Sequence, residues 1–202
     1  MEAAPKPTRE RIIDAAGKLF YADGVHSVSM DAIAEASAVT KRTLYYHFRS
    51  KDDLIAAWLE TRDQPNLAAF RHWFSRAEGD VAARIRAIFT ALGRAARRGD
   101  WKGCGFLRIS VELVKLPGHP AVVAARAHKK RVDEWLETVL EAAGHGGHTA
   151  SSNTASLARQ IVLLMDGAFA DALLYRDAVW FDDAGLAAET LIRAELRRRA
   201  QG

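Results

Sequence analysis

Cysteine is nearly absent from this chain of 202 residues, in which Cys104 stands alone. A single thiol cannot form a disulfide within the chain, and it cannot supply a metal site built from several thiolates. Long apolar runs are missing as well, since no stretch approaches the roughly 18 uninterrupted apolar residues of a membrane span. The N-terminus also lacks the pattern of a signal peptide. These absences exclude disulfide-rich and membrane classes, and we expect a protein of the cytoplasm.

Proline is scarce too, with five residues in the chain, two of them (Pro5 and Pro7) near the N-terminus. Few helix breakers and many alanines favour a mostly helical protein. Residues 25–30 and 107–114 alternate like strands, but the second segment fits a helix equally well. We therefore predict an all-α fold and leave the structure of residues 107–114 open.

Four short helices are predicted in the N-terminal part of the chain. The first runs from about residue 9 to residue 22, with Thr8 as a candidate cap and Gly24 just past its end. A serine or threonine that can cap a helix precedes each of the other three, and these residues are Ser29, Thr40 and Ser50. The fourth helix is expected to kink at Pro65.

The remaining sequence predicts longer helices that form a second domain. Their expected ranges are 66–78, 80–98, 105–115, 119–143, 152–177 and 183–200. The helix at 152–177 is apolar almost all round, so every side of it needs cover, which a second subunit would supply. We therefore expect a homodimer formed through the helices near 152–177 and 183–200.

Residues 36–51 contain no acidic side chain, although they carry four basic ones, Lys41, Arg42, Arg49 and Lys51. The two short helices within residues 29–48 have the size and apolar pattern of a helix-turn-helix. In the second of them Leu44 and Phe48 share one face, which leaves the opposite face free. Positively charged and hydroxyl side chains at the start of such a helix can bind DNA phosphates, and arginine or lysine can bind the edge of guanine. This pattern therefore predicts DNA binding.

Three blocks of sequence carry a family resemblance: TRERIIDAAGKLFYADG at residues 8–24, MDAIA at 30–34 and TLYYHFRSKDDL at 43–54. In this order and spacing they resemble the tetracycline-repressor (TetR) family of transcriptional regulators, over about a quarter of the chain. The resemblance implies a flexible tail at 1–7 and a three-helix DNA-binding domain at 8–54. It also implies a C-terminal helical bundle at 55–202 for ligand binding and dimerisation.

The resemblance assigns DNA-binding roles to eight residues. Thr40 would cap the recognition helix, Lys41 and Arg42 would face bases, and Lys51 would clamp a phosphate. Further contacts to the phosphate backbone would come from Thr43, Tyr45, Tyr46 and His47. The chain departs from the family pattern at Ala38 and Arg42, where the family often has glycine. We expect alanine at position 38 to make the turn slightly less stable than glycine would. Because Arg42 places a long cation in the recognition helix, the operator sequences of relatives should not predict the operator that this chain prefers.

The second domain has many aromatic and soft side chains, which suit an apolar effector pocket and an ordinary core equally well. The candidate pocket residues are Phe70, Trp73, Phe74, Phe106, Glu112, His128, Met165, Asp166 and Phe169. Three of these would supply polar groups, namely Glu112, His128 and Asp166. His145 and His148 make only half a metal site, so neither a metal nor a cofactor is predicted.

The sequence thus predicts a homodimeric, sequence-specific regulator that a small molecule releases from a near-palindromic DNA operator. Most members of the family are repressors, so the resemblance implies repression. One alternative is a helical ligand carrier or interaction module that has lost DNA binding. Another is a helical enzyme that uses His119, His128 or Asp166, but the chain shows no paired carboxylates, nucleophile elbow or phosphate loop.

Overall fold

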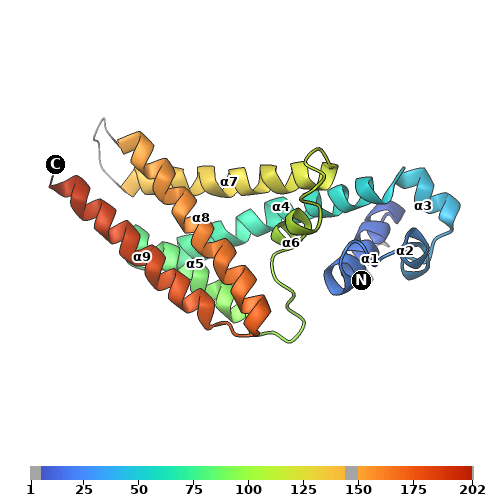
Figure 1. Ribbon diagram of the computed structural model, residues 1–202, viewed down its shortest axis with the longest axis horizontal. Coiled ribbons are helices and arrows are strands. Elements are labelled where there is room, and N and C mark those ends of the chain that lie inside the picture. The colour runs from blue at the N-terminus through green and yellow to red at the C-terminus, as the bar shows by residue number, and fades with distance from the viewer. Residues whose placement is uncertain (1–5, 144–149, 202) are drawn as a thin grey trace, which may run out of the picture. The chain divides into compact units, whose positions relative to one another are not determined.

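The computed structural model describes residues 6–143 and 150–201, and within these ranges every regular element is a helix (Figure 1). The all-α prediction is therefore confirmed, and residues 107–112 of the ambiguous segment lie in a helix. Among the described residues no helix is both long enough and apolar enough to cross a membrane. His145 and His148 lie outside the described residues. The helices are α1 (Thr8–Asp23), α2 (Met30–Ala36), α3 (Lys41–His47), α4 (Lys51–Arg76), α5 (Val81–Ala96), α6 (Gly105–Glu112), α7 (Pro120–Ala143), α8 (Ala150–Tyr175) and α9 (Val179–Ala200).

Side-chain caps begin the helices α2, α3 and α4. Ser29 accepts a hydrogen bond from the backbone N–H of residue 32, and Thr40 accepts one from that of residue 43. Ser50 does the same for residue 53, at the start of α4. Each bond satisfies one of the free N–H groups of a helix N-terminus, as predicted. Thr8 was wrongly predicted as a cap, because α1 already includes Thr8 and its cap position is Pro7, without a side-chain bond.

Helix α4 continues through Pro65, where the sequence predicted a kink followed by a separate helix at 66–78. That prediction is wrong as far as the helix boundary is concerned. Proline removes one intrahelical hydrogen bond and crowds the carbonyl four residues earlier, so packing must hold the helix together. Buried residues lie on both sides of the proline, with Leu59 before it and Leu67 after it.

The chain forms two compact units. Unit 1 comprises Met1–Gln64 and Gly105–Ala127, and unit 2 comprises Pro65–Cys104 and His128–Gly202. Helix α6 and the start of α7 therefore cluster with the N-terminal helices, although the sequence placed everything after residue 54 in one second domain. Helices α4 and α7 each run from one unit into the other.

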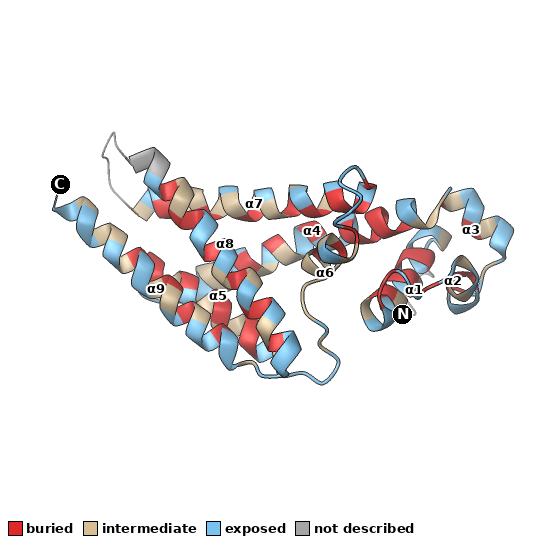
Figure 2. Cartoon of the chain, in the orientation of Figure 1, coloured by how far each residue is buried: buried red, intermediate tan, exposed pale blue. Residues whose placement is uncertain are grey.

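The core of unit 1 is built from one apolar face of each short helix. Its fully buried side chains include Phe20 on α1, Ile33 on α2, Leu44 on α3 and Phe106 on α6. Figure 2 shows the contrast between the buried inner face of α1 and the exposed surface of α3. One apolar face on each helix fixes how α2 and α3 pack, and therefore which side of α3 remains outside.

Unit 2 is centred on α9, which packs against α5 and α8 (Figure 1). Gly185 permits close approach of α9 to α5, because an added Cβ would lie 2.9 Å from the Cβ of Phe89. Ion pairs flank this contact on the surface, where Arg86 binds Glu189 at 2.7 Å and Arg193 binds Asp80 at 2.5 Å.

Glu195 near the end of α9 makes part of the stability of unit 2 dependent on pH. Hydrogen bonds from Arg198, and then from Arg199, lower the pKa of Glu195 from 4.5 to about 2. A carboxylate with a depressed pKa stabilises the fold above pH 4.5 and loses that contribution as the pH falls towards 2.

We expect Glu195→Gln to lower the free energy of unfolding at pH 7 by about 1 kcal/mol, since Arg198 is solvent-exposed and screened. Urea unfolding between pH 7 and pH 3 measures this, and the gap to wild type should narrow below pH 4.5. The matched control is Glu141→Gln at an exposed position of α7. A gap that stays constant over the whole range would contradict the assignment.

Candidate nucleic-acid interface

The turn between α2 and α3 is held by backbone and side-chain hydrogen bonds, including two from α1. The backbone N–H of Val39 donates to the carbonyl of Ala34, and the Ser37 hydroxyl donates to the carbonyl of Ile33 at 2.6 Å. Arg11 reaches over from α1 and donates to the carbonyls of Ser37 and Ala38 at 3.0 and 3.3 Å. This guanidinium ties the turn to the first helix, so α3 keeps a fixed orientation on unit 1.

Ala38 adopts the left-handed backbone conformation in this turn, with φ of +52°. A side chain there meets a steric penalty of about 1 kcal/mol that glycine avoids. The predicted small cost of alanine at this position thus has a structural cause.

We expect Ala38→Gly to raise the free energy of unfolding by about 0.5–1 kcal/mol, because relief of strain outweighs the greater freedom of glycine in the unfolded chain. Chemical denaturation measures the change. Ala36→Gly, at the last residue of α2, is the control and should lower stability, because glycine is the poorer helix former. Equal losses in both variants would refute the strain at residue 38.

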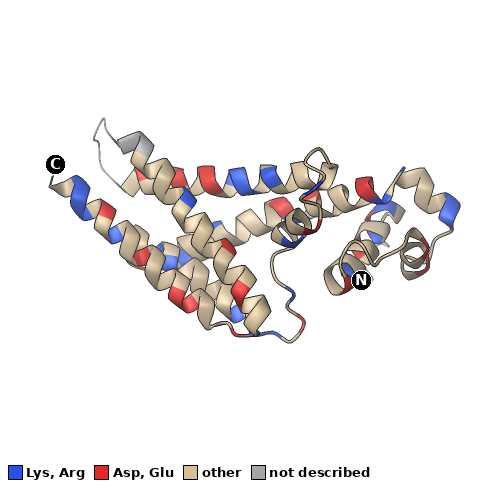
Figure 3. Cartoon of the chain, viewed as in Figure 1, with Lys and Arg blue, Asp and Glu red and all other residues tan. Residues whose placement is uncertain are grey.

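Helix α3 buries one face and exposes the other. Leu44 and Phe48 are buried, as predicted, while Tyr46 is 85% exposed and Tyr45 is 50% exposed. Lys41 and Arg42 are exposed at the start of the helix, and Figure 3 shows this basic segment of α3. A large exposed tyrosine beside exposed cations has no role in the core of unit 1, and it suits contact with a polyanion.

Asp31 on α2 holds the side chain of Lys41. The ammonium lies 2.7 Å from the Asp31 carboxylate, and this hydrogen bond raises the pKa of Lys41. Asp31 was not predicted as a partner of Lys41, although both residues lie in the first turns of adjacent helices. Because both side chains are solvent-exposed, the pair orients Lys41 at small energetic cost and can exchange for another anion.

Lys51 and Thr40 also make contacts within the protein. The ammonium of Lys51 donates to the carbonyls of Val25 and Val28, at 2.9 and 3.1 Å, so it braces the loop before α2. Two of its three protons are used there, and a phosphate would have to bind the third. The hydroxyl of Thr40, which caps α3, also lies 2.9 Å from the hydroxyl of Thr43.

Arg9 packs over the ring of Phe48, with its guanidinium carbon 5.1 Å from the ring centroid. This cation–π contact joins α1 to the residue that ends α3. His47 is half-buried, and its ring lies edge-on to Tyr46 at 5.2 Å. The contact between Arg9 and Phe48 joins residues 39 positions apart, so it could not be read from spacing along the sequence.

Helix α6 is tied to the last turn of α1 and to the loop that follows it, within unit 1. A carboxylate oxygen of Glu112 accepts a hydrogen bond from the backbone N–H of Val25 at 3.1 Å. Arg108 on the same helix donates to the carbonyl of Tyr21 at 2.9 Å. His119 caps the start of α7 by accepting from Ala121, and its other ring nitrogen lies 3.2 Å from Asp52 on α4.

The nine predicted pocket residues divide between the two units. Phe106 and Glu112 belong to unit 1, where Glu112 binds the backbone, while the other seven belong to unit 2. Within unit 2 the ring of Phe169 stacks on Trp101, and Asp166 forms an ion pair with Lys129. The remaining five, in or beside the core, are Phe70, Trp73, Phe74, His128 and Met165. None of the nine lines either of the two pockets described below.

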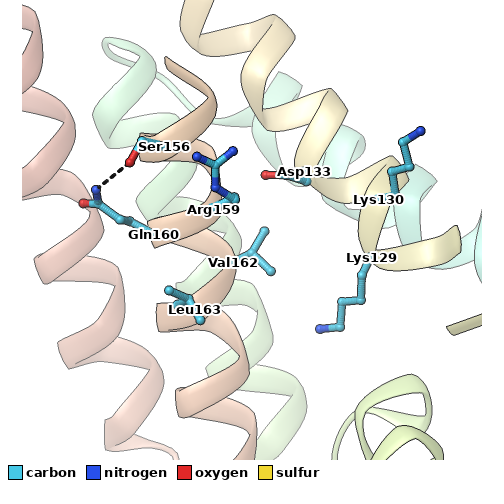
Figure 4. Close-up of a pocket in the computed structure, with 8 residues that line it drawn as sticks. All are labelled: Lys129, Lys130, Asp133, Ser156, Arg159, Gln160, Val162 and Leu163. Atoms are coloured by element: carbon cyan, nitrogen blue, oxygen red, sulfur yellow. Dashed lines mark hydrogen bonds between the residues drawn. The ribbon is translucent and has the colours of Figure 1, made fainter. Parts of the chain in front are cut away.

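One of these pockets is a groove of about 470 Å³ between α7 and α8. Figure 4 shows Asp133 on α7 facing Arg159 on α8, with Val162 and Leu163 forming the apolar part of the lining. Burial raises the pKa of Asp133, which Arg159 partly offsets. Leu163 is 70% exposed.

The second pocket, of about 660 Å³, lies between the end of α5, the residues that follow it and the turn from α8 to α9. Its lining is more polar than that of the groove between α7 and α8, and it includes four basic side chains. Both pockets belong to unit 2.

Comparisons with known proteins agree with this geometry. The family model described as "Bacterial regulatory proteins, tetR family" matches residues 12–58, and "Tetracyclin repressor-like, C-terminal domain" matches residues 81–187. The Escherichia coli regulator UidR is 44% identical over 71 residues, which are 35% of this chain and 36% of UidR. This chain therefore matches about a third of the length of that relative.

Solved structures extend the likeness to nearly the whole chain. A TetR-family regulator from Streptomyces coelicolor is 29% identical with a TM-score of 0.80, over 93% of this chain and 95% of that one. A TetR-type regulator from Streptomyces avermitilis is 30% identical with a TM-score of 0.76, over 94% and 98%. These relatives are regulators, which speaks against the helical enzyme. The chain belongs to the TetR family of bacterial regulatory proteins.

Proposed function

We propose that this protein is a DNA-binding transcriptional regulator, a repressor that acts in the cytoplasm. The observation that carries the proposal is the exposed face of α3, where Lys41, Arg42, Tyr45 and Tyr46 stand free of the core. Leu44 and Phe48 fix the helix from the other side. An α-helix fits the major groove, and arginine or lysine at its start can reach guanine O6 and N7.

The contacts divide into base reading and backbone positioning. We assign base reading to Lys41 and Arg42, and phosphate contacts to the hydroxyl and ring groups of Thr43, Tyr45, Tyr46 and His47. Lys51 would add a phosphate contact through its third proton. Thr40 supports this surface by capping α3. Phosphate contacts determine affinity at any sequence, whereas base contacts determine the preference between sequences.

A second copy of the chain would cover the exposed apolar side chains of α8 and α9. These side chains are Leu163, Leu173, Leu174, Tyr175, Val179, Trp180, Leu186 and Leu191. The groove between α7 and α8 lies beside Leu163 and adds to this apolar surface (Figure 4). Such a patch on a water-soluble surface marks an interface. A twofold dimer would present two copies of α3 to a near-palindromic operator.

A small molecule bound in unit 2 would act on DNA binding through α6 and α7. Helix α7 is continuous from Pro120 in unit 1 to Ala143 in unit 2. Its start is capped by His119. The preceding helix α6 holds the α1–α2 loop through Glu112 and the last turn of α1 through Arg108. A shift of α7 would therefore reach the loop that leads into the helix-turn-helix. Effector and operator would then weaken each other's binding equally.

The test of DNA binding is a pair of substitutions at Tyr46. Tyr46→Phe removes one hydroxyl, and we expect it to lower affinity about five- to tenfold on specific and non-specific DNA alike. Tyr46→Ala should lower it further. Fluorescence anisotropy with labelled duplexes measures both, at several salt concentrations.

Affinity of the wild type should fall with salt by about 0.9 log units per decade for each phosphate neutralised. Thermal unfolding is the control, because an 85% exposed side chain should leave stability unchanged. Binding that is insensitive to both Tyr46 variants and to salt would refute the proposed interface.

A further inference from the structure

The pocket at the end of α5 gathers positive charge from three segments of unit 2. Its basic lining residues are Arg97, Arg98, Lys102 and Arg176, and its acidic lining residue is Asp177. The Asp177 carboxylate accepts a hydrogen bond from the backbone N–H of Val179, so it is engaged at the start of α9. Arg97 is also paired with the Asp182 carboxylate at 3.0 Å. The positive charge that remains around the cavity favours a bound anion.

Arg176 is held in an unusual backbone conformation. It directly follows the last residue of α8, and its φ of +55° lies in the left-handed region. Glycine is the usual residue at such a helix end, because a side chain there is strained. Here the strained position instead carries a long cationic side chain that lines the cavity. Backbone strain concentrates at ligand sites, where it fixes the direction of a side chain.

An aromatic ring forms another part of the lining. Trp101 lines the pocket and stacks on Phe169, with ring centroids 6.3 Å apart and an interplanar angle of 14°. It also packs edge-on against Phe181 at 6.1 Å. Contacts with two buried phenylalanines hold the indole in place, so the cavity combines a fixed planar surface with cationic side chains.

We propose that this pocket binds a small organic polyanion, bearing two or more carboxylate or phosphate groups on a compact frame. A volume of about 660 Å³ accommodates a molecule of metabolite size. Guanidinium groups bind carboxylate and phosphate through paired hydrogen bonds, which gives both anions the same recognition chemistry. This inference is independent of the proposed function, because binding is measured on the free protein without DNA.

Isothermal titration calorimetry on the full chain tests the pocket with two probes, pyrophosphate and benzene-1,3,5-tricarboxylate. We expect saturable binding of at least one probe with a dissociation constant below about 1 mM. Tighter binding of pyrophosphate identifies a phosphate ligand, and tighter binding of the planar tricarboxylate identifies a carboxylate ligand. No saturation by either probe up to about 5 mM overturns the proposal.

Arg176→Gly separates binding from folding, since glycine suits the backbone at this position. The variant should unfold at or above the temperature of the wild type, yet bind the probe at least tenfold more weakly. Arg98→Gln should weaken binding similarly, while Arg94→Gln removes an equal charge from an exposed position of α5 outside the pocket and should not. Equal weakening in all three variants would mean general charge attraction only, and would overturn the site.

Discussion

Replacing Gly17 with alanine is expected to lower the free energy of unfolding by about 2–3 kcal/mol, although alanine is the better helix former. Gly17 lies in α1, where a Cβ would fall 2.3 Å from Nε1 of Trp58 and 2.5 Å from its Cδ1. No methyl group fits at these distances, so either the ring or α1 must move.

The Trp58 ring has little room to move. Its six-membered ring lies against Gly105 of α6, where an added Cβ would stand 3.2 Å from Cη2. Phe20 packs edge-on against it, with ring centroids 5.8 Å apart. Because the indole is enclosed by α1 and α6, overpacking at residue 17 strains several elements of unit 1 together.

Chemical denaturation followed by tryptophan fluorescence measures this loss. Gly167→Ala is the matched control, because residue 167 lies inside α8 and an added Cβ meets nothing within 4 Å. The same substitution should there raise stability by up to about 1 kcal/mol. If Gly17→Ala and Gly167→Ala changed stability equally, the contact between α1 and Trp58 would not restrict the side chain at residue 17.

Replacing Arg42 with alanine is expected to change which DNA sequence the protein prefers. An arginine that bonds guanine O6 and N7 contributes about 1–3 kcal/mol of discrimination, so one base position should lose tenfold or more in selectivity. The side chain is exposed on α3, and Leu44 rather than Arg42 fixes the helix to the core. The loss should therefore concern specificity and leave folding intact.

The measurement is a competition among operator variants that differ at single base pairs, bound by wild type and by Arg42→Ala. Arg94→Ala is the control, since it removes the same charge from an exposed position of α5. It should preserve the ranking of variants. If Arg42→Ala also preserves the ranking, Arg42 contacts only phosphate and the bases are read elsewhere.

Local rules predicted much of the fold. Caps at Ser29, Thr40 and Ser50 act on N–H groups three residues away, so the sequence contains all that they need. The buried face of α3 followed in the same way from the spacing of Leu44 and Phe48.

Partners distant in sequence could not be predicted. Glu112 was predicted to line an effector pocket, and its carboxylate accepts a hydrogen bond from the backbone N–H of Val25, 87 positions away. Arg11 likewise braces a turn 26 residues on. Continuation of α4 through Pro65 was missed because packing on both sides, rather than local propensity, decides it. Such contacts depend on tertiary structure, about which periodicity carries no information.

The most direct test of the central claim is selection of DNA fragments from the source genome by the purified protein, followed by sedimentation of the complex with the best fragment. The account predicts a short inverted repeat bound by two chains, with half-sites one helical turn, about 34–36 Å, or a multiple of it apart. Fragments without a shared sequence at any salt concentration, or a complex holding one chain, would contradict it.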